Sequence, residues 1–244
     1  MGGGIKTMNK FNEIFLDLEK KILAKQYPPH TLLPSENQLI KIYGVSRETI
    51  RKALQLLTTE GYIQKKQGKG SIVLERSRFD FPISGLTSYK ELQETQNIPS
   101  ETIVQELSET KVDKELSEIT GWKIGTPVWH LVRQRKIAGE VVILDRDYLL
   151  KEVVPTLSIE QAKASIYDYF ENELGLTIAY AQKEITVEPV TPEIHEAMTL
   201  KDDPYVVIVR GLVHLEDTRC FEYTESIHRL DKFRFVEFAR RRKV

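Results

Sequence analysis

The sequence is poor in the features that mark secreted, membrane-spanning and metal-dependent proteins. Among its 244 residues it has one cysteine, Cys220, so no internal disulfide can form, and we expect a cytoplasmic protein. No apolar run approaches the roughly 20 residues that cross a bilayer, and no apolar signal segment opens the chain. Its five histidines follow neither a metal-ligand spacing nor a pattern of nucleophilic catalysis, and no glycine-rich nucleotide motif occurs. We therefore expect no metal, no cofactor and no catalytic residues.

Charge divides the chain into two unlike parts. Residues 1–76 hold 13 Lys and Arg against 7 Asp and Glu, whereas the remainder carries a net charge of −7. Such asymmetry is typical of a chain with a nucleic-acid-facing end and a separate, solvated body. We predict an N-terminal domain over residues 8–74, a linker over 75–82 and a C-terminal domain over 83–244. Residues 1–7, a glycine run before a second methionine, are interpreted as a cloning remnant.

Apolar spacing and capping residues predict three helices in the N-terminal domain. Apolar residues at helical spacing indicate a helix over about 9–25. Ser35 and Gln38 form the capping box of a second, short helix, which Gly44 ends. Ser46 caps a third helix directly afterwards. Two helices joined by a tight turn that contains glycine are typical of a helix-turn-helix.

The polar face of the third helix carries side chains suited to DNA bases. Arg47, Arg51 and Gln55 recur at every fourth position there, and Arg and Gln pair bidentately with guanine and adenine edges. The alternative is a solvated basic helix face. However, residues 61–74 follow as a β-hairpin with three lysines and a glycine tip, which is typical of a wing that contacts the DNA backbone and minor groove. The sequence therefore predicts a winged helix-turn-helix that binds double-stranded operator DNA.

Segments 33–36, 45–54 and 61–70 resemble the DNA-binding domain of bacterial GntR-family regulators, and the resemblance covers residues 8–74 without a gap. It implies contacts to the operator from the starts of the second and third helices and from the wing. The residues concerned are Ser35, Asn37, Ser46, Arg47, Thr49, Arg51, Gln67, Gly68 and Lys69. Asn37 departs from the family, since several members carry a basic residue at that position.

The C-terminal domain is predicted to be α+β, with an antiparallel sheet. Turn signals at 138–139 and 217–218 indicate hairpins, which make neighbouring strands antiparallel. We predict six strands, at about 101–110, 128–137, 140–149, 178–188, 205–216 and 219–229. We predict four helices, at about 88–96, 112–120, 165–174 and 192–198.

One predicted strand places two arginines on a face that also carries apolar side chains. Period-two alternation puts Arg133 and Arg135 on the same side of the strand. A guanidinium on a partly buried face needs an anionic partner, because an unpaired buried charge is costly. The partner is either an anionic ligand, since paired arginines suit phosphate or carboxylate, or a carboxylate of the sheet itself, such as Asp145 or Asp147.

Two further segments have the composition of an anion site. Residues 82–90 form a Gly/Ser/Thr loop that runs into a helix, and Ser165 caps another helix. Helix N-termini offer free N–H groups and the positive end of the helix dipole, which suits phosphate.

Segments 84–89, 132–135, 144–148, 165–167 and 228–235 resemble the effector-binding (UTRA) domain of the HutC branch of GntR regulators. The resemblance implies a chorismate-lyase-like fold and ligands that are often sugar phosphates. It assigns phosphate contacts to Thr87, Ser88, Tyr89, Arg133, Arg135 and Ser165, and sugar contacts to Asp145, Tyr167, Glu222 and Tyr223. Asp145 departs from the longer Glu that is common in the branch.

Within that branch, segments 173–176, 180–189 and 223–235 resemble the trehalose-operon repressors of Gram-positive bacteria. This implies a repressor that trehalose 6-phosphate releases from its operator. We further predict a homodimer on a palindromic operator. Two alternatives stay open: a regulator, including an activator, tuned to another sugar phosphate or a carboxylate, and a lyase-like enzyme domain fused to a DNA-binding module.

Overall fold

The computed structural model describes residues 9–66, 68–75, 89–96 and 99–235. The chain divides into two compact units, whose described parts are residues 9–75 and residues 89–235. Most of the predicted linker and all of residues 1–7 lie outside the described residues. Across the part that is described, no helix combines the length and the apolar composition that a membrane crossing requires.

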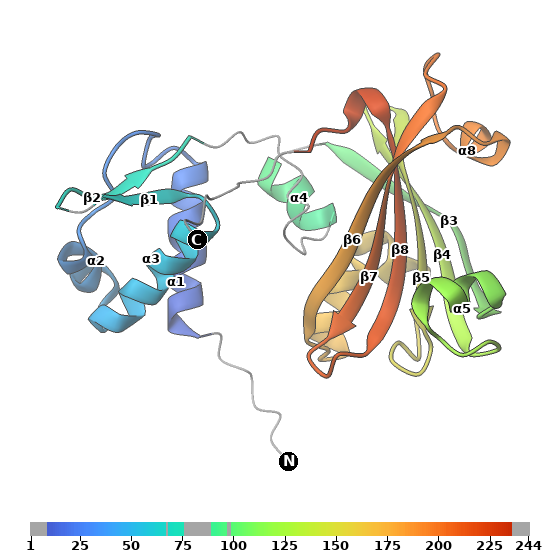
Figure 1. Ribbon diagram of the computed structural model, residues 1–244, viewed down its shortest axis with the longest axis horizontal. Coiled ribbons are helices and arrows are strands. Elements are labelled where there is room, and N and C mark those ends of the chain that lie inside the picture. Colours follow the sequence, from blue (N-terminus) through green and yellow to red (C-terminus); the bar gives the residue numbers. More distant parts are fainter. Residues whose placement is uncertain (1–8, 67, 76–88, 97–98, 236–244) are drawn as a thin grey trace, which may run out of the picture. The chain divides into compact units, whose positions relative to one another are not determined.

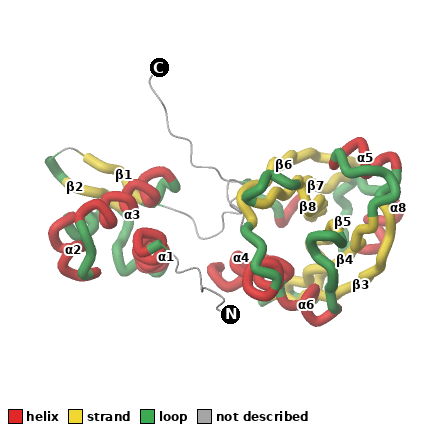
Figure 2. The backbone as a smooth tube through the Cα atoms, turned by 90° about the horizontal axis from the view of Figure 1, so that it is seen from below, coloured by secondary structure: helices red, strands yellow, loops and turns green. Residues whose placement is uncertain are grey.

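The N-terminal unit consists of three helices and a β-hairpin, as predicted (Figure 2). The hairpin pairs its two strands in antiparallel register. Gly44 adopts a left-handed conformation with φ of 63° and ends the second helix, so the turn to the third helix is tight. The elements are α1 (Lys10–Leu23), α2 (Glu36–Tyr43), α3 (Arg47–Thr59), β1 (Ile63–Lys66) and β2 (Gly70–Val73).

The core of this unit fixes which face of α3 points outward. Ile50, Ala53, Leu54 and Leu57 are buried on one side of α3. They join one apolar cluster with residues of α1, α2 and the hairpin. Each buried Leu or Ile stabilises the fold by roughly 1.5–3 kcal/mol. Because this side is committed to the core, the polar side of α3 is left at the surface.

The C-terminal unit is built on a six-stranded antiparallel sheet (Figure 1). Each predicted strand is present, with both bounds within one residue of the prediction. Ala138 and Gly139 both have positive φ, which is the geometry of a tight two-residue hairpin turn. The strands, in the spatial order β3-β4-β5-β8-β7-β6, are β3 (Ser100–Lys111), β4 (Pro127–Ile137), β5 (Glu140–Leu150), β6 (Ile178–Pro189), β7 (Tyr205–Leu215) and β8 (Cys220–Arg229).

Short helices accompany the sheet, and one α-helix and the 3-10 helix η2 among them were not predicted. The missed α-helix, α6 (Ile159–Ala164), starts at a capping box formed by Ser158 and Gln161. The predicted helix over 165–174 is a short α-helix that continues as a π-helical turn. The other elements are α4 (Tyr89–Gln96), α5 (Lys114–Thr120), α7 (Ile166–Asp168), η1 (Tyr169–Glu173), α8 (Pro192–Ala197) and η2 (Leu230–Lys232).

Different helices pack on the two faces of the sheet. Ile194 of α8 packs in a cluster with Leu144 and Ile227, whose side chains lie on one face. Phe170 of η1 belongs to a second cluster that contains Leu131 and Leu149, on the other face. That second face also carries Arg133 and Arg135, and we call it the arginine face. The prediction of two domains with an α+β C-terminal part is confirmed.

Candidate functional site

The exposed side of α3 and the start of α2 bring together most of the predicted DNA contacts. Arg47 Nη2 donates a hydrogen bond of 2.9 Å to Asn37 Oδ1, and Arg51 Nε donates one of 3.1 Å to Glu36 Oε2. Asn37, Arg47 and Arg51 are exposed. Four donor and acceptor side chains of adjacent helices therefore form one polar surface, which has the groups needed to contact DNA bases and phosphates.

The predicted serine and threonine contacts hold the starts of the two helices. Ser35 Oγ accepts a hydrogen bond from the backbone N–H of Gln38, and the Gln38 side chain accepts one from the Ser35 N–H at 2.8 Å. Ser46 Oγ accepts from the Thr49 N–H at 3.2 Å and lies 2.9 Å from Thr49 Oγ1. These hydroxyl groups leave other N–H groups of the first turns available to an anion such as a DNA phosphate.

The tip of the hairpin carries the predicted wing contacts. Gly68 and Gly70 have φ of 73° and 102°, which a residue with a Cβ rarely adopts. The backbone N–H of Lys69 donates to Lys66 O at 3.0 Å and closes the turn. Lys66 and Lys69 are exposed, whereas Gln67 lies outside the described residues.

In the C-terminal unit, the two predicted arginines pair with carboxylates on the arginine face. Arg133 Nη2 lies 2.5 Å from Asp147 Oδ2, and Arg135 Nε lies 2.8 Å from Asp145 Oδ2. None of the four residues is more than 7% exposed. Although burial favours the neutral form, the guanidinium groups of Arg135 and Arg133 lower the pKa of Asp145. Of the two predicted kinds of partner, a sheet carboxylate or a ligand, the sheet carboxylates occupy one donor of each guanidinium.

Glu222 and Tyr167 complete this buried cluster. Glu222, on β8, is 1% exposed, and burial followed by the charge of Asp147 raises its pKa to about 8. It interacts electrostatically with Tyr167, and burial followed by the charge of Glu222 raises the pKa of the Tyr167 phenol well above its usual value. Within the described part of the chain, Glu222 Oε2 and Arg133 Nε are buried without a hydrogen-bond partner. Buried polar atoms are nearly always bonded, so these two atoms indicate a site for a polar ligand.

The remaining predicted ligand contacts are only partly brought together. The ring of Tyr89, at the start of α4, lies 4.5 Å from the guanidinium carbon of Arg135, in a cation–π contact. Ser165 is buried and caps α7 by accepting from the Asp168 N–H at 3.3 Å. Residues 87 and 88, the predicted Thr and Ser contacts, lie outside the described residues.

Tyr223 lies apart from the other predicted sugar contacts. It follows Glu222 on β8, and successive side chains of a strand point to opposite faces. Its hydroxyl donates to Glu225 Oε1 at 2.9 Å, and its ring stacks with that of Tyr148 at 6.3 Å. Tyr223 therefore belongs to the face opposite the arginines.

Sequence reasoning missed two residues that hold the buried cluster. Ser226 Oγ donates to Asp145 Oδ1 at 2.6 Å, and Thr102 Oγ1 accepts from Arg135 Nη1 at 2.6 Å. Each residue lies directly opposite a member of the cluster on the neighbouring strand, since Ser226 pairs with Asp145 and Thr102 pairs with Arg135. No local pattern marks them, because only the strand order shows which residues are neighbours.

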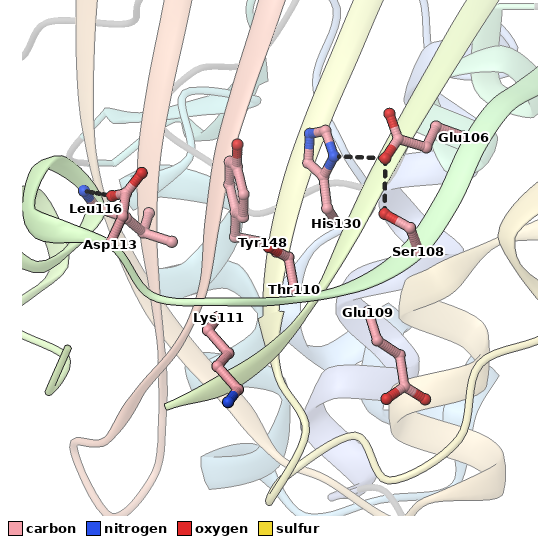
Figure 3. A pocket seen from close by; sticks show the side chains of 9 residues that line it. All are labelled: Glu106, Ser108, Glu109, Thr110, Lys111, Asp113, Leu116, His130 and Tyr148. Carbon is pink, nitrogen blue, oxygen red and sulfur yellow. Dashed lines mark hydrogen bonds and ion pairs between the residues drawn. The ribbon is translucent and has the colours of Figure 1, made fainter. Parts of the chain in front are cut away.

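A separate cavity of about 220 Å³ lies on the face opposite the arginines, at its β3 end (Figure 3). His130 Nδ1 lies 3.1 Å from Glu106 Oε1, to which Ser108 Oγ donates at 2.6 Å. These two bonds lower the pKa of Glu106. The described residues that line the cavity include none of the predicted ligand contacts. In the described part of the chain, no group of three His, Cys, Asp or Glu side chains is arranged to hold a metal ion.

Comparisons with known proteins match both units. Residues 10–73 match the family of bacterial regulatory proteins called gntR, and residues 95–234 match the UTRA domain. The HTH-type transcriptional regulator TreR of Bacillus subtilis strain 168 is 48% identical over 236 residues, which are 97% of this chain and 99% of that protein. The HTH-type transcriptional regulator GmuR of the same organism is 28% identical, over 93% of this chain and 96% of that protein.

Solved structures agree with these matches. The effector binding domain of the B. subtilis trehalose repressor (TreR) is 48% identical, covers 59% of this chain and is itself 99% covered, with a TM-score of 0.55. The possible transcriptional regulator YydK of B. subtilis covers 96% of this chain and is fully covered, with 25% identity and a TM-score of 0.79. These relatives are transcriptional regulators. The chain therefore belongs to the GntR family of bacterial regulatory proteins, as a UTRA-domain transcriptional regulator of the TreR type.

Proposed function

We propose that this chain represses a trehalose-utilisation operon and leaves its operator when trehalose 6-phosphate binds to the C-terminal unit. The observation that carries the proposal is the 48% identity with TreR over nearly the whole of both chains. The effector binding domain with that identity belongs to a protein called the trehalose repressor. In this function the protein works in the cytoplasm and is not an enzyme.

The N-terminal unit supplies the operator contacts in this proposal. α3 enters the major groove, where Arg47 and Arg51 contact base edges. The N-terminal residues of α2 and α3 and the wing, from Gln67 to Lys69, contact the backbone. A homodimer places two copies of α3 in successive major grooves about 34–36 Å apart, so the operator is palindromic.

The buried cluster of the C-terminal unit supplies the effector site. The charges of Arg133 and Arg135 are balanced by those of Asp145 and Asp147, and Glu222 with a pKa of about 8 is mostly neutral at pH 7. A phosphate group therefore binds through guanidinium N–H groups that the aspartates leave unpaired, such as Arg133 Nε, rather than through excess positive charge.

The other predicted contacts are assigned to phosphate and to sugar in the proposed site. Tyr89 and Ser165 complete the phosphate contacts together with residues 87 and 88. Glu222 Oε2, Tyr167 and Asp145 contact sugar hydroxyls, because carboxyl and phenol groups bond readily to them. Tyr223 is left out of the site, since its side chain lies on the opposite face of the sheet.

Release from the operator requires that the effector prefer one conformation of the dimer, because a ligand shifts an equilibrium only by its differential affinity for the two states. The contact of Tyr89 with Arg135 supports a structural link between effector binding and the conformation of the dimer. Tyr89 begins α4, the first described element after the predicted linker, so a ligand that moves the Arg135 guanidinium also changes the packing of α4.

The decisive experiment is a fluorescence-polarisation titration of the full chain with trehalose-operon promoter DNA, with and without trehalose 6-phosphate. We expect binding that weakens with salt and that trehalose 6-phosphate weakens further, while trehalose and inorganic phosphate do not. Failure to bind any promoter duplex contradicts the DNA-binding part of the proposal. Binding that responds instead to another sugar phosphate contradicts the choice of effector.

The second candidate is a regulator of the same family that responds to another phosphosugar. It is favoured by the chemistry of the cluster, since guanidinium and carboxyl groups that bind one phosphosugar bind several. Thermal unfolding against a panel of phosphosugars separates the candidates, because a ligand at 100 times its Kd stabilises by about 2.7 kcal/mol.

A further inference from the structure

Two neighbouring residues of α2 each accept a hydrogen bond from one arginine of α3. Asn37 Oδ1 accepts from Arg47 Nη2 at 2.9 Å, and Glu36 Oε2 accepts from Arg51 Nε at 3.1 Å. The two arginines are one helical turn apart. The two contacts differ in charge, because the Glu36 carboxylate neutralises Arg51 whereas the Asn37 amide leaves the charge of Arg47 intact.

The hydrogen bond from Arg47 leaves most of both side chains available. A guanidinium has five N–H donors, so Arg47 keeps the others for the two acceptors on a guanine edge. Asn37 and Arg47 are both exposed, so DNA can reach them without a rearrangement of the core.

We infer that Asn37 is a positioning residue, which orients the Arg47 guanidinium so that the pair reads a guanine in the operator as one unit. This inference rests on the proposed operator contacts of α3. A free arginine side chain carries about 2 kcal/mol of rotamer entropy, which binding must overcome. A contact that restricts the guanidinium before DNA arrives reduces that cost and narrows the geometry in which a base is accepted.

Because Asn37 is uncharged, its contact with Arg47 favours discrimination between bases over a general gain in affinity for DNA. A lysine or arginine at this position makes a phosphate contact of its own, which strengthens binding to every sequence alike. An asparagine adds no charge, and its effect passes through the orientation of Arg47. Asn37 therefore raises discrimination between bases more than it raises affinity.

The test uses the full chain and an operator duplex selected by the wild-type protein from random double-stranded DNA. Binding is measured by fluorescence polarisation at several salt concentrations, on the selected duplex, on duplexes with each guanine of a half-site replaced, and on an unrelated duplex. For Asn37→Ala we expect binding to the selected duplex to be weaker by roughly 5- to 10-fold for each half-site, which corresponds to loss of about one hydrogen bond per subunit. We expect unchanged binding to the unrelated duplex and reduced discrimination at one guanine.

Two further substitutions at the same position separate orientation from charge. Asn37→Asp keeps the acceptor for Arg47, so we expect discrimination at that guanine to be retained while affinity falls equally for all duplexes. Asn37→Arg adds a phosphate contact, so we expect stronger binding to the unrelated duplex and a salt dependence that is steeper by about one counterion per subunit. Thr59→Ala, at the exposed C-terminal end of α3, is the control and should leave this guanine unaffected.

A double-mutant cycle decides whether Asn37 acts through Arg47. Once Arg47→Ala is present, adding Asn37→Ala should change neither affinity nor base preference. Additive effects of the two substitutions, or an Asn37→Ala protein with the base preference of the wild type, overturn the inference. If the wild-type chain selects no duplex at all, the proposed DNA binding fails instead, so the two failures are distinct.

Discussion

The two units use arginine in opposite ways. Arg47 and Arg51 of the N-terminal unit are exposed, and the Arg51 side chain keeps 61% of its accessible surface beside Glu36. Arg133 and Arg135 of the C-terminal unit are at most 5% exposed and pair with buried aspartates. Exposed ion pairs contribute roughly 0–1 kcal/mol, whereas breaking a buried pair costs about 3–5 kcal/mol. We therefore expect substitution of the exposed arginines to affect binding alone, and substitution of the buried arginines to affect folding as well as binding.

Arg133→Ala should have the largest effect. It leaves Asp147 buried without its partner, so we expect a loss of about 3–5 kcal/mol in the free energy of unfolding. We also expect a protein that trehalose 6-phosphate no longer releases from the operator. Denaturant unfolding and polarisation titrations measure the two effects.

A second variant separates folding from effector binding at this site. Arg133→Met with Asp147→Leu removes both charges, which should restore most of the stability because no unpaired buried charge remains. The response to trehalose 6-phosphate should stay absent. A double variant that still releases DNA at the usual effector concentration contradicts the assignment of Arg133 to the phosphate site.

The next largest effect is a pH dependence of the free energy of unfolding, caused by Glu222. Its pKa is raised to about 8 in the folded chain, mainly by burial, from an ordinary value of 4.5. A raised folded pKa contributes stability that is fully present below pH 4.5 and is lost as pH rises to about 8. Relative to Glu222→Gln, the wild type should therefore lose a few kcal/mol across this window and then level off. Urea unfolding from pH 5 to pH 9 checks this, and parallel curves for the two proteins contradict a raised pKa.

Arg51→Ala should have a smaller effect, confined to DNA binding. Loss of one bidentate base contact costs about 1–3 kcal/mol, so operator affinity should fall by roughly 5- to 150-fold for each half-site. The free energy of unfolding should change by less than about 0.5 kcal/mol, because the side chain is exposed. Calorimetric binding of trehalose 6-phosphate should be unchanged. A large loss of stability in Arg51→Ala would contradict the expected difference between the exposed Arg51 and the buried Arg133.

The smallest effects compare two serine caps, one in each unit. Ser46 is exposed and caps α3, whereas Ser165 is buried and caps α7. Substitution of either by alanine should cost about 1 kcal/mol of stability. Ser46→Ala should weaken operator binding and leave effector affinity unchanged, and Ser165→Ala should do the reverse. If both variants lower the affinity for the same ligand, operator DNA or effector, to an equal extent, the separation of the two sites is contradicted.

Much of the fold was predictable because its signals are local. The capping box at Ser35, the glycine after α2 and the hairpin turn at Ala138 each act within a few residues, and the structure contains all three. The helix α6 was missed although Ser158 and Gln161 carry the same capping signal as Ser35 and Gln38. At six residues α6 has no apolar period to support the cap, whereas α8, of the same length, also carries a proline at its first position as a start signal.

The candidate site was predictable only in part, because strand neighbours are not a local property. Alternation along β4 was enough to place Arg133 and Arg135 on one face, and both are buried there. The roles of Ser226 and Thr102 depend on register with strands that are distant in sequence. The family resemblance assigned both Glu222 and Tyr223 to the sugar, whereas alternation along β8 puts the two side chains on opposite faces of the sheet.

By itself the sequence determined the caps, the turns, the strand positions and the family, since each of these depends on residue types within short segments. Only the tertiary structure decided that β8 lies beside β5, which brings Glu222 and Ser226 to the aspartates that pair with the arginines. The physical reason is that backbone hydrogen bonds between strands are identical for any pair of sequences. The choice of partner strand therefore depends on how all the side chains pack together.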